Sequence, residues 1–74
     1  MSESGAGAMT IRVNGKETPV PSGATLAMLV ERLGLAGAPC AAEVNRRFVP
    51  KRAHADCTLH EGDAVELVTL VGGG

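Results

Sequence analysis

The spacing of the apolar residues changes partway along this 74-residue chain, and this change constrains the fold more than any other feature. Met9, Ile11 and Val13 alternate with polar residues, the period of two that is typical of a strand with one buried face. After position 25 the spacing becomes helical, because four apolar residues fall on one stripe: Leu26, Leu29, Val30 and Leu33. A strand followed by one short amphipathic helix predicts a sheet with a helix covering one face.

Turn and cap residues set the limits of these first elements. Asn14-Gly15 is a strong signal for a two-residue hairpin turn, so the chain should return in a second strand over 16–20. Pro19 lies in that strand and has no N–H, so we expect the strand at an edge of the sheet. Thr25 is the expected N-cap of the helix, and Gly34 stands at its C-cap position.

The second half of the chain predicts further strands. We expect a strand over 40–45, a polar turn at Arg46-Arg47 and a short partner strand at Phe48-Val49. Residues 51–56 are polar and predict one helical turn, and the last strand is expected over 64–71. The helical crossover returns the later chain to the middle of the sheet, so the first and last strands should be adjacent and parallel there.

These elements predict an α+β domain with a mixed sheet of four or five strands and one main helix packed on one face. We expect a flexible leader over 1–8, the folded domain over 9–71, and a free glycine tail over 72–74. The composition agrees with a globular domain, since 45% of the residues are hydrophobic and 20% are charged. Phe48 is the one aromatic residue of the chain, so the core must be aliphatic.

The last predicted strand has apolar residues on both faces. Val65, Leu67 and Thr69 should face the helix, and the alternate residues should face outward. The outward residues, together with the residue that precedes the glycines, are candidates for a docking patch: Glu66, Val68, Leu70 and Val71. A central strand can also be apolar on both faces because both are buried, and the sequence leaves these two interpretations open.

Several classes of function are disfavoured. The net charge is −1 and no aromatic platform is present, so we expect no nucleic-acid partner. The chain has no apolar run of membrane-spanning length and no secretory signal over 1–8, which predicts a cytoplasmic protein without a membrane partner. It also lacks the common nucleophile and phosphate-binding motifs, so we expect a protein that is not itself an enzyme.

The thiol and imidazole side chains do not form a recognised metal motif. His54, Cys57 and His60 are three residues apart, with Cys40 as a distant fourth, but zinc sites are normally built from closely spaced pairs of ligands. We therefore expect no metal, free thiols, and residues at the solvent edge with Cys57 partly buried.

Three consecutive glycines end the sequence: Gly72, Gly73 and Gly74. Glycine has the largest backbone entropy to lose and no Cβ, so this tail should extend from the sheet and could enter a tunnel too narrow for other residues. A terminal carboxylate is ionised at neutral pH and can attack an activated phosphate. Gly74 is therefore the candidate reacting residue, and Gly72 and Gly73 are candidates for threading.

Several segments of the chain resemble the ThiS family of sulfur carrier proteins of thiamine biosynthesis, which have the ubiquitin-like β-grasp fold. The segments that carry the resemblance are Val13-Asn14-Gly15-Lys16, Thr25-Leu26, Glu43-Val44-Asn45, Val49-Pro50, Glu61-Gly62-Asp63-Ala64-Val65-Glu66-Leu67-Val68 and Val71-Gly72-Gly73-Gly74. The resemblance implies that an E1-like adenylyltransferase of the ThiF type consumes ATP to adenylate Gly74. A cysteine desulfurase relay then converts Gly74 to a thiocarboxylate, which gives its sulfur to a thiazole synthase of the ThiG type.

The resemblance also implies a carrier that binds no cofactor of its own and is a monomer when alone. Other interpretations remain open at this stage. They are a sulfur carrier of the molybdopterin-synthase small-subunit type, a ubiquitin-like protein modifier, and a plain binding module whose glycines take no part in chemistry. All of them share the fold, and the first two share the reactive glycine end.

Overall fold

A computed structural model describes residues 7–37 and 40–69 of the chain. The remaining residues, 1–6, 38–39 and 70–74, lie outside the described part. The described elements follow one another in the order β1 (Ala8–Val13), β2 (Lys16–Pro21), α1 (Leu26–Arg32), β3 (Cys40–Val44), β4 (Arg47–Val49), the 3-10 helix η2 (Lys51–Asp56) and β5 (Ala64–Thr69).

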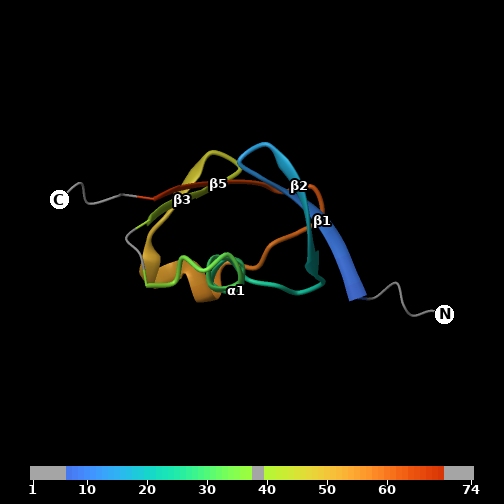
Figure 1. Cartoon of the computed structure of the whole chain (residues 1–74), viewed down its shortest axis with the longest axis horizontal. Helices are drawn as coiled ribbons and strands as arrows, with labels where there is room; N and C mark the ends of the chain where they lie inside the picture. The colour runs from blue at the N-terminus through green and yellow to red at the C-terminus, as the bar shows by residue number, and fades with distance from the viewer. Residues whose placement is uncertain (1–6, 38–39, 70–74) are drawn as a thin grey trace.

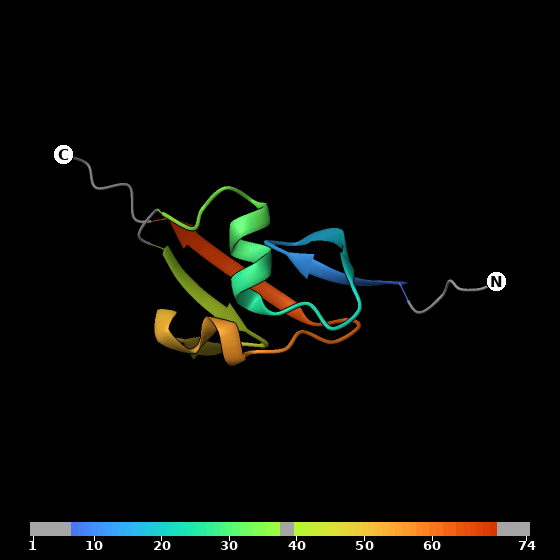
Figure 2. The same cartoon turned by 90° about the horizontal axis from the view of Figure 1, so that it is seen from below.

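The five strands form one mixed sheet in the order β2-β1-β5-β3-β4. β1 and β5 are parallel, whereas the pairs β1 with β2, β3 with β5 and β3 with β4 are antiparallel. Helix α1 lies on one side of the sheet (Figure 1), where it crosses over β5 (Figure 2). The predicted α+β class, the parallel first and last strands and the edge position of β2 are all confirmed.

The hairpin between β1 and β2 uses the predicted turn. Asn14 and Gly15 both have positive φ angles, 52° and 84°, as a two-residue type I′ turn requires. The Ser22 amide donates to the Gly7 carbonyl across the pair, and successive backbone groups point to opposite edges of a strand. The prolines at 19 and 21 therefore stand at positions that face away from β1, where the missing N–H removes no ladder hydrogen bond.

Helix α1 begins at the predicted cap. The Thr25 hydroxyl accepts a hydrogen bond from the Met28 amide at 3.2 Å, and this satisfies one of the free N–H groups of the first turn. The buried residues of the helix are Leu26, Leu29 and Val30.

The helix ends one residue earlier than the predicted stripe requires. Leu33 is its C-cap and is 44% exposed, so the expectation that Leu33 belongs to the buried stripe is wrong. Gly34 follows with φ of 78°, and its amide donates to the Glu31 carbonyl while the Leu35 amide donates to the Val30 carbonyl. These two bonds form a Schellman motif, which turns the chain away before Leu33 can reach the core.

The turn between β3 and β4 lies one residue before the predicted position. Asn45 and Arg46 occupy it with φ angles of 52° and 71°, whereas Arg47 is the first residue of β4 and pairs with Val44. A type I′ turn needs two residues with positive φ, and asparagine adopts that conformation more readily than most residues. The expected turn at Arg46-Arg47 and the expected end of β3 at Asn45 are therefore wrong by one residue.

The predicted helical turn over 51–56 is the 3-10 helix η2. It contains His54, which is 5% exposed, so its expected place at the solvent edge is wrong. The His54 Nε2 lies 3.0 Å from the Val49 carbonyl oxygen, and because a carbonyl can only accept, Nε2 donates its proton there. This bond satisfies a buried imidazole nitrogen. Cys57 is half-buried, as expected.

The core between the sheet and α1 is aliphatic, as the composition predicts. Its buried hydrophobic residues are Ile11, Val13, Val20, Ala24, Leu26, Leu29, Val30, Ala42, Leu59, Val65 and Leu67. Side chains from four of the strands, from α1 and from the segments that flank the helices contribute to it, so every element depends on the same small volume.

Truncation of one core side chain should therefore destabilise the whole domain. Leu29 is 1% exposed, and we expect Leu29→Ala to lower the free energy of unfolding by about 2–5 kcal/mol. Chemical denaturation measures this loss. The matched control is Met28→Ala on the exposed side of α1, which should change the stability by about 0.5 kcal/mol. Equal losses in the two variants would contradict the assignment of the core.

Candidate functional site

The candidate site is the end of β5, where the chain continues toward its three terminal glycines. Glu66 and Val68 are the predicted site residues that the structure describes. The other predicted site residues lie outside the described residues: Leu70, Val71, Gly72, Gly73 and Gly74. Their proposed roles in docking, threading and sulfur transfer stay predictions.

The two neighbouring strands, β1 and β3, pair with β5 over different lengths. β3 pairs with every described residue of β5 except Ala64, from Val65 opposite Val44 to Thr69 opposite Cys40. The register with β1 ends earlier, at Val65. The second half of β5 therefore needs another partner on the side of β1 if its backbone groups are to be satisfied.

The side chain of Asn14 supplies this partner. The backbone amide of Asn14, directly after β1, donates to the Val65 carbonyl at 2.8 Å, and this is the last backbone bond to β5 on this side. The Leu67 amide then donates to Asn14 Oδ1 at 2.8 Å, and Asn14 Nδ2 donates to the Leu67 carbonyl at 3.2 Å. The carboxamide thus stands where the next peptide group of β1 would lie. We call this pair of side-chain bonds the Asn14 clamp.

Asn45 makes a similar contact at the opposite end of β5. Its backbone amide donates to the Ala64 carbonyl at 2.7 Å, and the Ala64 amide donates to Asn45 Oδ1 at 3.0 Å. Asn45 Nδ2 donates to Asp63 Oδ1 at 3.0 Å, while the other Asp63 oxygen accepts from the His60 amide. Asparagines in two separate hairpin turns therefore bond to the same strand, Asn45 at its first residue, Ala64, and Asn14 at Leu67.

The outward face of β5 is open to solvent. Val68 is 57% exposed and Glu66 is also exposed, whereas Val65 and Leu67 are buried under the helix. The interpretation that both faces of this strand are buried is therefore wrong. Thr69 is exposed as well, although the alternation places it on the helix side.

Neighbouring strands add residues to this face that the sequence reasoning did not connect with it. Glu43 stands directly opposite Glu66, and Phe48 stands directly opposite Glu43, so one row crosses three strands. Val68 stands opposite Ala41 in the next row. We call these five residues the outer-face patch. Phe48 is 64% exposed. The signal available in the sequence was that Phe48 is the one aromatic residue of the chain and directly follows two arginines.

The patch combines apolar and acidic character. Like charges directly opposite one another destabilise an antiparallel pair, so Glu43 and Glu66 add negative charge to this face at some cost to the sheet. Phe48 and Val68 lie on the same side of the sheet as these carboxylates. The patch therefore suits a partner surface that is apolar with a basic side chain.

The remaining thiol and imidazole groups do not assemble into a further centre. Burial raises the pKa of the Cys57 thiol, and the negative charge of Asp63 raises it further, so Cys57 is a poor nucleophile at neutral pH. Cys40 and Cys57 are free thiols, as predicted. Within residues 7–37 and 40–69, no three His, Cys, Asp or Glu side chains come together as metal ligands.

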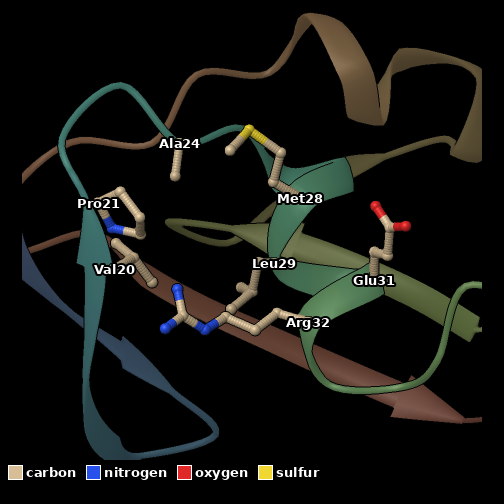
Figure 3. Close-up of a pocket in the computed structure, with 7 residues that line it drawn as sticks. All are labelled: Val20, Pro21, Ala24, Met28, Leu29, Glu31 and Arg32. Atoms are coloured by element: carbon tan, nitrogen blue, oxygen red, sulfur yellow. The ribbon is translucent and has the colours of Figure 1, made fainter.

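A separate groove of about 320 Å³ lies between β2 and α1 (Figure 3). Its walls are mostly apolar, with Glu31 and Arg32 from the helix as its charged residues, and Arg32 extends toward the strand. The residues that line it are Val20, Pro21, Ala24, Met28, Leu29, Glu31 and Arg32. Neither Glu66 nor Val68, the two predicted site residues that the structure describes, lines this groove, and it shares no residue with the outer-face patch.

In the part of the chain that the structure describes, every helix is too short or too polar to cross a membrane.

Known proteins are similar to this chain in sequence and in fold. The chain is 33% identical to a thiazole synthase of Paramagnetospirillum magneticum over 66 residues, and 35% identical over 66 residues to a thiazole synthase of Magnetococcus marinus. Each match covers 89% of this chain but only 20% of the relative, so the chain spans one fifth of the length of these curated relatives.

One solved structure is similar to most of this chain. The crystal structure of the thiamine biosynthesis protein ThiS from Geobacter metallireducens superimposes with a TM-score of 0.75 and 32% identity, over 89% of this chain and 100% of that one. The described sheet and helix are therefore those of the ThiS β-grasp fold. The model of the ThiS family matches residues 8–74, and this chain belongs to the ThiS family.

Proposed function

We propose that this chain is a sulfur carrier protein of thiamine biosynthesis. The observation that carries the proposal is the course of β5, a central strand held on both sides that leads directly toward three terminal glycines. Such a strand gives the last residues a fixed starting point on a rigid domain. Membership of the ThiS family and the fold shared with ThiS of Geobacter metallireducens support the proposal.

The proposed chemistry takes place at the carboxylate of Gly74. An E1-like adenylyltransferase of the ThiF type would bring this carboxylate to the α-phosphorus of ATP, forming an acyl-adenylate and releasing pyrophosphate. A persulfide supplied by a cysteine desulfurase relay would then attack the acyl carbon through its outer sulfur, and AMP would leave. A thiol reductant would supply two electrons to cleave the S–S bond of the resulting acyl disulfide, and the donor thiol would leave. The product is a thiocarboxylate, which carries nucleophilic sulfur in covalent form. Gly72 and Gly73 would let the chain pass through a narrow channel.

A thiazole synthase of the ThiG type is the proposed acceptor of the sulfur. The support comes from the two thiazole synthases, because a segment similar to this chain forms 20% of each polypeptide. A carrier-like segment in the same chain as the synthase is expected if the two proteins act on one another.

The active sites would belong to the partners. This chain would hold no cofactor, ATP would be consumed by the adenylating enzyme, and the carrier would act as a monomeric co-substrate in the cytoplasm. The outer-face patch would dock on the partners, because it is the exposed apolar surface on the strand that precedes the glycines.

Mass spectrometry of the intact protein tests the chemistry. Incubation of the full chain with ATP, a ThiF-type enzyme and a sulfur donor should raise its mass by the difference between sulfur and oxygen. The control variant lacks Gly73 and Gly74 and should gain no mass while it keeps its thermal midpoint. An unchanged mass of the wild-type chain would refute the carrier function. Conjugates with other proteins that survive reducing denaturation would indicate a protein modifier instead.

Truncation of the outer-face patch tests docking. We expect Val68→Ala to raise the KM for the carrier in ATP–pyrophosphate exchange by the adenylating enzyme, by about threefold to tenfold, because a partly exposed apolar contact is lost. The stability should change little, since Val68 is 57% exposed. Met28→Ala is the matched control, as it truncates an exposed apolar side chain on the helix. An equal KM for both variants would place docking elsewhere.

A further inference from the structure

We propose that Asn14 is a positioning residue of the carrier, whose side chain directs the end of β5 so that the terminal glycine reaches a partner's active site. The inference rests on the proposed function and goes beyond it, because it assigns a role to a turn residue that is distant from the reacting carboxylate in the sequence. Three features of the described residues carry it: the early end of the register with β1, the Asn14 clamp, and the backbone angles of the turn.

The first feature is the gap that the clamp fills. The register of β1 with β5 ends at Val65, while β5 itself continues to Thr69. The backbone groups of Leu67 point to the side of β1, as their bonds to Asn14 show. Both bonds between Asn14 and Leu67 are part-buried, so without the clamp the Leu67 N–H and C=O would lose their protein partner on this edge and depend on water.

The second feature is the fit of the carboxamide. A peptide group offers one N–H and one C=O to its neighbour, and the asparagine side chain offers the same pair at 3.2 and 2.8 Å. Aspartate would keep the acceptor for the Leu67 amide but would place a second oxygen against the Leu67 carbonyl. Glycine would leave both groups of Leu67 without a partner.

The third feature is the backbone of the turn. Asn14 has φ of 52°, so the main chain turns away into Gly15 at the point where the side chain takes over the direction of the strand. Only glycine, asparagine and aspartate adopt this conformation readily. One residue therefore closes the hairpin and extends the sheet at the same time. The clamp acts on the last half of β5, the part nearest to the terminal glycines.

Control of this strand direction matters because of the length that follows. A fully extended segment from Leu67 to Gly74 reaches roughly 25 Å. The direction in which β5 leaves the sheet sets the point from which this reach begins. Misplacement of a reacting group by about 1 Å already slows enzymatic reactions. If the end of β5 is free in the unbound carrier, it must be ordered on docking, and this ordering lowers the apparent affinity for the partner.

The test compares glycine substitutions in the two hairpin turns. Asn14→Gly and Asn45→Gly each keep a residue that tolerates positive φ, and each removes two side-chain hydrogen bonds, from Leu67 in one variant and from Asp63 and Ala64 in the other. We expect Asn14→Gly to raise the KM for the full-length carrier in ATP–pyrophosphate exchange by about fivefold relative to Asn45→Gly, with kcat unchanged. Thermal unfolding of both variants checks that each is folded at the assay temperature.

Amide hydrogen exchange gives a readout that needs no partner enzyme. In Asn14→Gly the Leu67 amide should exchange at least about tenfold faster, whereas the Glu66 amide, which faces β3, should keep its protection. Asn14→Asp keeps the acceptor for the Leu67 amide, so the protection of that amide should largely return. The KM should return toward the wild-type value to a smaller extent, because the second aspartate oxygen faces the Leu67 carbonyl. An equal KM for the two glycine variants, or unchanged exchange at Leu67, would overturn the proposal.

The outcomes separate this inference from the proposed function. If the wild-type chain supports no ATP–pyrophosphate exchange with the adenylating enzyme, the carrier function fails, and a positioning role for Asn14 fails with it. If the wild-type chain is a good substrate and the two glycine variants have the same KM, only the positioning role fails.

Discussion

The hydrogen bonding of β5 is the constraint on which the rest of the structure depends. A strand in the middle of a sheet must satisfy its backbone groups on both edges, yet the pairing of β5 with β1 ends at Val65, and β3 ends at Val44 before it can pair with Ala64. Asn14 and Asn45 resolve both mismatches with side-chain amides. Each belongs to a type I′ turn, so the conformation that closes the hairpin also places the amide beside β5. Two local turns thereby determine the position of a strand far away in sequence.

This arrangement explains how so small a domain can present its end to a partner. One short helix and one face of the sheet enclose an aliphatic core. The other face of the sheet stays free for contact, and the strand that leads toward the glycines runs through its middle. Under the proposed function the domain needs only a docking face and a directed end, and both would belong to β5.

Much of the fold follows from the sequence, because its signals are local. The period of two in β1, the Thr25 cap and the Asn14-Gly15 turn each act within a few residues, and the structure confirms them. The features that the sequence did not predict are those that depend on contacts between residues far apart in the chain. The Asn14 clamp and the Asn45 contact depend on a register between residues about fifty and twenty positions apart, and the buried His54 donates a hydrogen bond to the Val49 carbonyl. The turn at Asn45 was misplaced because its polar neighbours hid the preference of asparagine for positive φ.

The exposed patch and the clamp also suit a carrier that must leave each partner. A single reactive carboxylate can occupy only one active site at a time, so the adenylating enzyme and the sulfur acceptor would have to bind in succession. Exchange between them requires moderate affinity, and an outer-face patch with two large apolar side chains is typical of a small transient interface rather than an obligate one. Precise delivery must then come from the carrier itself, since a weak interface leaves little binding energy for ordering a long tail. A strand whose direction is set before docking meets this requirement, because the cost of its order is met when the domain folds.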